Sequence, residues 1–454
     1  MATTVETNKM HWSRLICDKR FGLEDFHDSR PSAIRTDFRR DYDRLVFSSP
    51  FRRLQNKTQV FPLPGSIFVH NRLTHSMEVA CVGKSMADEI AESLRHKYAG
   101  EPWVDSLRNI SDIVAAACLA HDLGNPPFGH SGERAIATFF SEGDGRVLQT
   151  LLSEEQWADI THFEGNANAF RVLTHQFEGR RRGGFAMTYS TLASIVKYPF
   201  ESLLASKNKF GFFSSEKNDY LKVANELGII RLEAPDGMLR FARHPLVFIV
   251  EAADDICYEV MDIEDAHKLK HISTNEVIDA FMAFFTDDRR QQMTKIMANV
   301  SDPNEKVAYL RSCVVGTLVS RCAEAFLNNE DKILSGELQC PLLDLIPERE
   351  RLGYERCTKL SWEKIYCSGD VVDIELAGHR IITFLLEKFI YAVLHPELHY
   401  SRLLLGKFPN QYSVNSESLF GRVQAVLDHV SAMTDVYALD LYRKLNGIQL
   451  RIEN

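Results

Sequence analysis

The chain has 454 residues, of which 45% are hydrophobic and 25% charged, a composition typical of a globular protein with a large core. Its net charge of −9 excludes a global basic field that would bind nucleic acid or an anionic membrane. The nine cysteines form no CxxC motif, which argues against a zinc ribbon or a disulfide scaffold and favours a reducing, cytoplasmic setting. No apolar stretch is long enough to predict a membrane span, and the N-terminus lacks a signal-peptide core.

The first part of the chain is polar and then locally basic. Residues 1–34 are expected to form a partly irregular N-terminal extension. Residues 35–57 interleave arginines with aromatic residues and predict one helix up to Ser49-Pro50 and another after it. Their cations either contact phosphates or pair with neighbouring aspartates on a solvated face, and the sequence leaves both interpretations open.

The stretch NRLTHSMEVACVGKSMADEIAESL, which starts at residue 71, predicts a long amphipathic helix. We expect its apolar stripe to consist of Met77, Cys81, Met86, Ile90 and Leu94. His75 lies near the start of this helix. A single histidine at such a place is usually structural, so its meaning depends on the residues that follow.

The most informative stretch is ACLAHDLGNPPFGHSGE, residues 117–133. An alanine-rich run predicts a buried helix that ends at His121-Asp122. We expect Gly124 to cap this helix, because the two prolines after it prevent the helix from continuing. The following loop carries His130 and Glu133. Four titratable groups beside an apolar helix are costly in a purely structural role, although a capped helix with a polar loop is the alternative.

A second apolar helix is interrupted by acidic residues in HPLVFIVEAADDICYEVMDIEDA, which starts at residue 244. Asp254, Tyr258 and Asp262 are spaced four residues apart and therefore share one helix face. A carboxylate within an apolar helix needs a partner or a cation. Asp255 lies about 100° further round the helix, so we expect it to be the more exposed of the two neighbouring aspartates.

The remaining chain is predicted to be almost entirely helical, which makes the fold class all-α. Residues 206–220 are basic and aromatic and predict either a phosphate-facing lid or a surface hairpin. From about residue 270 onward the apolar spacing stays helical. Residues 330–372 have the weakest pattern and are the best candidate for a loosely packed insertion or linker.

The histidines and carboxylates at the ends or in the middle of apolar helices form one possible metal-ligand set: His75, His121, Asp122 and Asp254. Mixed nitrogen and oxygen ligation without thiolate suits Mn²⁺, Fe²⁺ or Mg²⁺, and in some proteins Zn²⁺. Such an ion polarises a phosphoryl oxygen. His130 can then act as a proton donor, with Glu133 as its orienting partner.

This order of ligands resembles the HD-domain metal-dependent phosphohydrolases. Nearly the whole chain, from about residue 30 onward, is similar to one branch, the bacterial dGTP triphosphohydrolases. The stretches that carry the similarity are DFRRDYDRLVFSSPFRRLQNKTQVFP, NRLTHSMEVA, AACLAHDLGNPPFGHSGE, HFEGNA, IVKYP, KFGFFSSEK, EAADDICYEVMD and MTDVYALDLY. Animal dNTP triphosphohydrolases place a second histidine where this chain has Asn125, so the resemblance favours the bacterial type, for which dGTP is the usual preferred substrate.

The resemblance implies a role for each matching position. The metal ligands would be His75, His121, Asp122 and Asp254. His130 would be the catalytic histidine near the Pα–O5′ bond, and Glu133 would orient it. Gln59 and Asp262 would hold the deoxyribose 3′-hydroxyl, and Tyr258 would pack under the sugar at C2′ and exclude a ribose. The phosphates would be bound by Arg72, Lys197 and Tyr198, with Lys209 and Lys217 as further contacts.

The resemblance also implies an organisation and an activity. Residues 35–275 would form the HD-domain catalytic core, and residues 276–454 a helical C-terminal region that completes the active site and the oligomer contacts. The expected reaction is hydrolysis of dGTP to deoxyguanosine and inorganic triphosphate, which controls dNTP pools. The alternatives are a broad dNTP triphosphohydrolase, a phosphohydrolase of monophosphates, or a nucleotide- or DNA-responsive regulator without catalysis.

The expected partners follow from the same resemblance. They are the substrate dGTP, further copies of the chain in a homo-hexamer, and single-stranded DNA as an allosteric activator. No membrane partner is expected. Since the whole chain is acidic, a DNA site would have to be a local groove, for instance around residues 180–182, with strong salt dependence.

Overall fold

The computed structural model describes residues 9–26, 35–61 and 69–448. Within these ranges the chain is helical, and β-structure is limited to isolated bridges such as Phe200↔Arg240. The all-α fold class predicted from the sequence is therefore confirmed. None of the helices in these ranges is both long and apolar enough to cross a membrane. Of the expected N-terminal extension, residues 1–8 and 27–34 lie outside the described residues.

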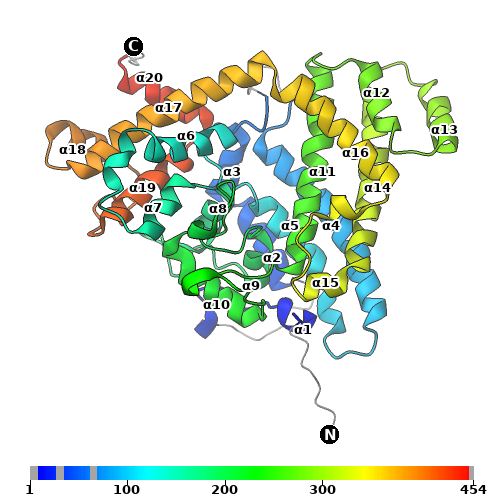
Figure 1. The fold of residues 1–454 in the computed structure, drawn as a ribbon, viewed down its shortest axis with the longest axis horizontal. Coiled ribbons are helices and arrows are strands. Elements are labelled where there is room, and N and C mark those ends of the chain that lie inside the picture. Colours follow the sequence, from blue (N-terminus) through cyan, green and yellow to red (C-terminus); the bar gives the residue numbers. More distant parts are fainter. Residues whose placement is uncertain (1–8, 27–34, 62–68, 449–454) are drawn as a thin grey trace, which may run out of the picture.

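The first half of the described chain contains the helices that carry most of the predicted site. They are α1 (Trp12–Leu15), α2 (Asp37–Val46), α3 (Ser49–Arg53), α4 (Arg72–Lys97), α5 (Ile110–Ala120), α6 (Gly129–Ser141), α7 (Glu154–Thr161), α8 (Gly165–Thr174), α9 (Tyr189–Ile195), α10 (Lys217–Leu227) and α11 (Pro245–Lys268). The helices α4 and α11 are long and pack against each other (Figure 1).

The second half adds nine α-helices within the described residues, several of which cover the first set. They are α12 (Thr274–Met282), α13 (Asp287–Met297), α14 (Pro303–Asn328), α15 (Glu330–Leu334), α16 (Glu348–Ser361), α17 (Gly369–Leu394), α18 (His399–Leu405), α19 (Leu419–Ser431) and α20 (Asp435–Leu445). A π-helical turn, Trp362–Tyr366, follows α16.

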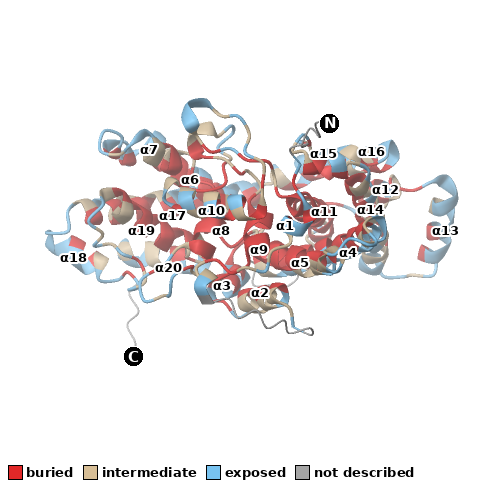
Figure 2. Ribbon diagram, turned by 90° about the horizontal axis from the view of Figure 1, so that it is seen from below, coloured by how far each residue is buried: buried red, intermediate tan, exposed pale blue. Residues whose placement is uncertain are grey.

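The apolar side chains gather in two clusters. One is built by α4, α5, α9, α11 and α14, and the other by α6, α7, α17 and α19 (Figures 1 and 2). Helix α5 lies at the centre of the first cluster, and every residue from Ile113 to Ala120 is buried. A helix that is apolar on all sides can only be stable inside a core. The end of α5, which carries His121-Asp122, is thereby held in a fixed place.

Two details of the predicted central helices are wrong. On α4, Met77 is 48% exposed and Cys81 is also exposed, because the face of α4 that contacts α5, α11 and α14 is centred on Val79, Met86 and Ile90. Gly124 does not cap α5 in a left-handed conformation. A side chain there would collide with α8, since a Cβ would lie 2.1 Å from the carbonyl oxygen of Gly165.

The prediction of a loosely packed linker at residues 330–372 is also wrong. Glu330, at the start of α15, is buried and accepts hydrogen bonds from Trp12, Lys97 and Tyr98. Helix α16 packs its Gly353 against the ring of Phe284. The pattern was weak because α16 buries only a narrow stripe and exposes its charged residues to solvent.

The sequence left open whether the basic residues of 35–57 and 206–220 face phosphates or a solvated surface. The structure answers this in part. Arg35 pairs with Asp43, and Arg40 pairs with Asp37, as on a solvated face. Residues 206–220 contain a tight turn in which Lys207 and Asn208 have positive φ, and the phenylalanines 210, 212 and 213 after it are buried. This arrangement is a short hairpin-like turn anchored in the core.

Candidate metal and catalytic site

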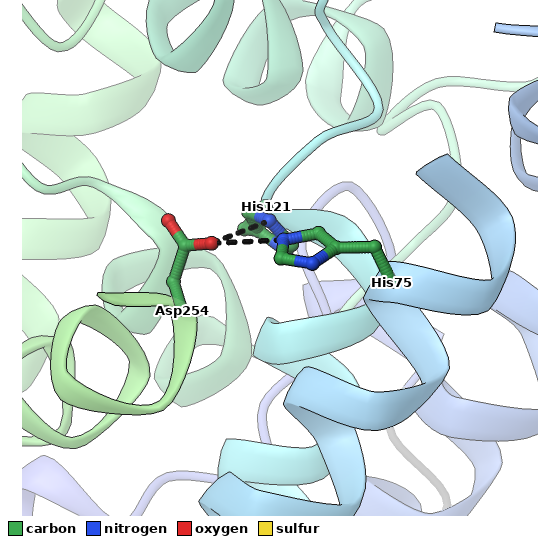
Figure 3. A group of neighbouring side chains, drawn as sticks. All are labelled: His75, His121 and Asp254. Atoms are coloured by element: carbon green, nitrogen blue, oxygen red, sulfur yellow. Dashed lines mark hydrogen bonds and ion pairs between the residues drawn. The ribbon is translucent and has the colours of Figure 1, made fainter. Parts of the chain in front are cut away.

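Three helices bring His75, His121 and Asp254 together. The Nε2 atom of His75 lies 3.0 Å from Oδ1 of Asp254, and Nε2 of His121 lies 3.4 Å from the same oxygen (Figure 3). Their ligand atoms all lie within 4.8 Å of one another, a spacing that can hold one metal ion. Three of the four residues predicted as metal ligands thus meet at one point, although they are up to 179 residues apart.

Local sequence sets the position of each of the three side chains. Asn71 and Thr74 form a capping box at the start of α4, which places His75 on the first helical turn. His121 is the C-cap of α5. Helix α11 starts with Pro245 at its first position and runs past Asp254 without interruption. Because α4, α5 and α11 pack against one another, the three side chains converge.

His121 is prepared to bind a cation. Its Nδ1 atom lies 2.6 Å from the carbonyl oxygen of Cys118, so Nδ1 carries the proton and donates it. In the neutral ring the lone pair is then on Nε2, which is buried, makes no hydrogen bond of regular geometry with the described residues, and has Oδ1 of Asp254 at 3.4 Å. A buried acceptor without a partner is costly unless a cation satisfies it. This orphaned atom, beside an imidazole and a carboxylate, fits a divalent metal.

The charges of the group are consistent with this chemistry. Burial disfavours a charged imidazole, but the carboxylates of Asp122 and Asp254 outweigh it and raise the pKa of His121 to about 9. Burial likewise disfavours the carboxylate of Asp254, but His121 and His75 hold its pKa well below the usual range. The site therefore attracts a positive charge, which is a proton on His121 when no metal is bound and the metal ion when one replaces that proton.

Asp122 lies beside the group of three. Its Oδ1 is 3.6 Å from Nε2 of His121 and also accepts a hydrogen bond from the amide of Asn125, while Oδ2 accepts one from Arg72 at 2.8 Å. Both oxygens thus have partners in the protein, and the role of Asp122 as a fourth ligand remains a prediction. Asn125, which the sequence analysis used only to separate two types of enzyme, orients this carboxylate.

His130 and Glu133 form a pair on the first turn of α6. Nδ1 of His130 lies 2.8 Å from one oxygen of Glu133, and the other oxygen accepts a hydrogen bond of 2.8 Å from the backbone amide of Gly165. The hydrogen bond to Glu133 raises the pKa of His130. This pair lines a cavity of about 400 Å³ together with Phe163, Glu164, Lys209 and others.

The cationic residues predicted to bind phosphates are held by carboxylates. Nζ of Lys197 is 3.1 Å from Glu251, and Nζ of Lys209 is 2.6 Å from Glu164. Lys209 lines the cavity beside His130, whereas Lys217 pairs with Glu155 and Glu201. The ring of Tyr198 lies 5.8 Å from the ammonium of Lys197.

Arg72 is buried, and its Nε makes no hydrogen bond with the described residues.

Two of the residues predicted to hold the sugar also contact Tyr366. Tyr258 stacks on Tyr366 with a ring separation of 5.8 Å, and the hydroxyl of Tyr366 donates a hydrogen bond of 2.8 Å to Asp262. Burial raises the pKa of Asp262 well above its usual range. Oε1 of Gln59 is buried and has no partner among the described residues. Asp255 is half-buried like Asp254, so its expected exposure is wrong.

Tyr366 is the residue that sequence reasoning missed. It lies in the π-helical turn Trp362–Tyr366, within the stretch predicted to be a linker. A π-helical turn often marks a functional site, but its backbone hydrogen bonds leave no trace in the apolar pattern. The available signal was a pair of aromatic residues, Trp362 and Tyr366, on either side of Ile365.

Known proteins match the chain over nearly its whole length. Residues 72–205 match the HD domain, and residues 350–444 match the phosphohydrolase-associated domain. The chain is 35% identical to a deoxyguanosinetriphosphate triphosphohydrolase-like protein of Synechocystis sp., over 97% of this chain and the full length of that protein. The chain belongs to the deoxyguanosinetriphosphate triphosphohydrolase-like family of HD-domain proteins.

Other members of the family also match most of the chain, at equal or lower sequence identity. The chain is 35% identical to a deoxyguanosinetriphosphate triphosphohydrolase-like protein of Pseudomonas aeruginosa, over 96% of this chain and 99% of that protein. It is 28% identical to a deoxyguanosinetriphosphate triphosphohydrolase of Yersinia enterocolitica, over 90% of this chain and 93% of that protein. As a member of the family, the chain is an HD-domain phosphohydrolase, and the His75–His121–Asp254 group is its possible metal site.

Proposed function

We propose that the protein hydrolyses dGTP to deoxyguanosine and inorganic triphosphate in the cytoplasm and so controls dNTP pools. The observation that carries the proposal is the buried Nε2 of His121, which makes no regular hydrogen bond among the described residues and converges with His75 and Asp254, in the same loop region as the His130–Glu133 pair. A metal-ligand group and a positioned proton donor are the two parts that metal-assisted phosphoester hydrolysis requires.

The metal ligands in this proposal are His75, His121, Asp122 and Asp254. Mn²⁺, Mg²⁺ and Fe²⁺ suit this donor set. When bound, the ion supplies positive charge that polarises a phosphoryl oxygen. Arg72 neutralises part of the acidic group by its hydrogen bond to Asp122, and it offers its free Nε to a phosphate oxygen.

His130 is the proton donor of the reaction. Water adds across the Pα–O5′ bond, so the O5′ atom of the leaving deoxyguanosine gains a proton. Because Nδ1 of His130 is bonded to Glu133, its Nε2 is the atom that gives up this proton. Glu133 is itself held by the amide of Gly165, which keeps the imidazole in one orientation.

Recognition of the nucleotide is assigned to residues around this centre. Gln59 and Asp262 hold the 3′-hydroxyl, and the buried Oε1 of Gln59, which accepts no hydrogen bond from the described residues, supports this role. Tyr258 packs under C2′, where a ribose hydroxyl would collide with its ring. The phosphates contact Arg72, Lys197, Tyr198, Lys209 and Lys217. A buried acceptor that binds a substrate hydroxyl discriminates strongly against analogues that lack it.

Product analysis tests the proposal. The protein is incubated with each of the four dNTPs and with GTP, in Mn²⁺ or Mg²⁺, beside an Asp122→Ala control. Deoxyguanosine and intact triphosphate from dGTP alone support the proposal. Equal turnover of all four dNTPs would replace dGTP specificity by broad specificity. Orthophosphate or pyrophosphate as the first product would contradict the role of His130, and metal and nucleotide binding without turnover would indicate a regulator.

The proposal extends to partners. A homo-hexamer and activation by single-stranded DNA follow from the resemblance to bacterial dGTP triphosphohydrolases. The guanidinium of Arg180 lies 5.3 Å from the ring of Phe185, an arrangement that can also bind a stacked base or a phosphate. Light scattering tests the hexamer. Activation by oligo(dT) that weakens steeply with salt tests the DNA site, and a salt-insensitive effect would contradict it.

A further inference from the structure

A single carboxylate near the end of the described chain bridges two loops of the site. Oδ2 of Asp435 accepts a hydrogen bond of 2.8 Å from the backbone amide of Thr58, and Oδ1 accepts one of 2.9 Å from the backbone amide of Phe128. Thr58 directly precedes Gln59, and Phe128 lies two residues before His130. Asp435 is only 7% exposed. It therefore ties the predicted sugar-binding loop to the predicted catalytic loop.

Lys57 forms a second connection between the same segments. Its ammonium is buried and donates hydrogen bonds to the carbonyl oxygens of Asn125 and of Ser431, the latter at 2.7 Å. Asn125 belongs to the loop after the His121-Asp122 pair, and Ser431 is the last residue of α19. The corner between α19 and α20 thus holds both loops from the same side.

Asp435 is not needed to cap its own helix. The hydroxyl of Thr434 accepts a hydrogen bond from the amide of Tyr437 and so caps α20. Both oxygens of Asp435 are used for amides that lie 307 or more residues away in the chain. A purely local role in α20 would leave these two long-range contacts without explanation.

The turn that Asp435 holds is strained. Phe128 has φ of +63°, a left-handed conformation that is rare for a bulky residue. Such a conformation persists only where the surroundings enforce it. Here Asp435 holds the amide, and α17 presents Gly378 to the ring, where any Cβ would lie 2.7 Å from Cβ of Phe128. Helices α17 and α20 together therefore aim the first turn of α6, which carries His130.

We propose that Asp435 is a positioning residue that couples recognition of the sugar 3′-hydroxyl at Gln59 to proton donation by His130. The inference rests on the proposed function for the roles of Gln59 and His130. Since one carboxylate holds both amides, a shift of either loop is transmitted to the other. Binding of the correct sugar would then favour the productive orientation of His130.

The test uses Asp435→Asn, which keeps the size of the side chain but turns an NH₂ group toward one of the two amides. Asp440→Asn is the matched control, because Asp440 lies on the same helix and pairs with Lys444 one turn further along it. We expect kcat for dGTP to fall about tenfold or more in Asp435→Asn. We also expect the preference for dGTP over its 3′-deoxy analogue to fall, while Mn²⁺ affinity stays unchanged.

Lower thermal stability with an unchanged kcat and an unchanged preference would show a merely structural role and overturn the inference. The two substitutions Asp435→Asn and Gln59→Ala are also combined. Their effects on kcat/KM are expected to be non-additive, because they interrupt the same connection. Additive effects would contradict the coupling.

Amide hydrogen exchange without substrate separates this inference from the proposed function. Exchange at Thr58 and at Phe128 is expected to accelerate together in Asp435→Asn and not in Asp440→Asn. Unchanged exchange would overturn the bridge even if dGTP is hydrolysed. If the wild type does not hydrolyse dGTP, the proposed function fails while the exchange result still decides the bridge. If Asp435→Asn does not fold, Gly378→Ala displaces the same turn, and a wild-type kcat in that variant would overturn the inference.

Discussion

The hydroxyl of Tyr366 donates a hydrogen bond to the carboxyl of Asp262, although the two residues are 104 positions apart. The bond connects the π-helical turn after α16 to the face of α11 that also carries Asp254 and Tyr258. Because Tyr366 also stacks on Tyr258, it contacts two of the three residues that we assign to the sugar. The second half of the chain therefore contacts two of the residues predicted to hold the sugar.

Tyr366→Phe removes this hydrogen bond and leaves a buried carboxyl without its partner. A lost hydrogen bond of this kind costs about 1–2 kcal/mol, so we expect KM for dGTP to rise about tenfold. Steady-state kinetics measure the effect. Tyr391→Phe is the control, since Tyr391 is exposed on α17. An unchanged KM in Tyr366→Phe would show that Asp262 does not need this partner.

Asp254→Asn removes the charge that lies between the two histidines. We expect the affinity for Mn²⁺ in calorimetric titration to fall by about 100-fold or more, with loss of activity. Treatment with a chelator should abolish wild-type activity, and added Mn²⁺ should restore it. Asp255→Asn is the matched control for metal binding, because Asp255 is the neighbouring aspartate but lies outside the group of three. Equal losses in both variants would refute the assigned ligand.

His130→Ala is expected to reduce kcat by about 10²–10⁴-fold while the affinity for Mn²⁺ is retained. Glu133→Gln tests the orienting partner through the pH dependence of kcat. Glu133 raises the pKa of His130, and a proton donor loses its function as the pH rises through its pKa. Without the Glu133 charge, the alkaline decline of kcat should therefore move to lower pH. A shift to higher pH would contradict this arrangement.

His70 should make stability depend on pH. Burial opposes its protonation, but Asp265 and Glu78, at 2.8 and 3.0 Å, outweigh it and raise its pKa to about 10. A raised pKa means that the stabilisation is complete below the unfolded value of about 6.5 and is lost as the pH rises to about 10.

The variant His70→Gln isolates this contribution. We expect the wild type to exceed the variant by about 2–4 kcal/mol in unfolding free energy near pH 6, and by much less near pH 10. Urea unfolding at several pH values measures the difference. A difference that stays constant across this range would show that the ion pairs of His70 do not supply the stabilisation.

The sequence was informative where one segment carried a strong local pattern. The apolar run before His121-Asp122 and the four-residue spacing of Asp254, Tyr258 and Asp262 both predicted helices that the structure contains. Local spacing also predicted that a histidine and an aspartate would end a buried helix. Local patterns could not predict that His75, His121 and Asp254 converge, because no local rule predicts how helices pack. That expectation came from the resemblance and from the free-energy cost of burying titratable groups.

The residues that the sequence did not indicate act over long distances. Tyr366 and Asp435 reach the site from segments far along the chain, and a single-sequence pattern contains no signal for such contacts. Gly124 was misread for a related reason. A glycine is required there because the backbone of α8 leaves no room for a Cβ atom. In the sequence, such a glycine cannot be distinguished from a glycine that caps a helix.

The bridge from Asp435 to the catalytic loop also has a consequence for the order in which the protein matures. During synthesis, the predicted metal ligands His75 and His121 leave the ribosome long before α20 does, and domains generally fold as their segments emerge. The contacts that hold Phe128 in its left-handed conformation come from Asp435 and from the helix of Gly378, which are synthesised much later. On the proposed roles, a nascent chain would contain both predicted histidine ligands before its catalytic turn is complete, so we expect hydrolysis only after the C-terminal helices have folded.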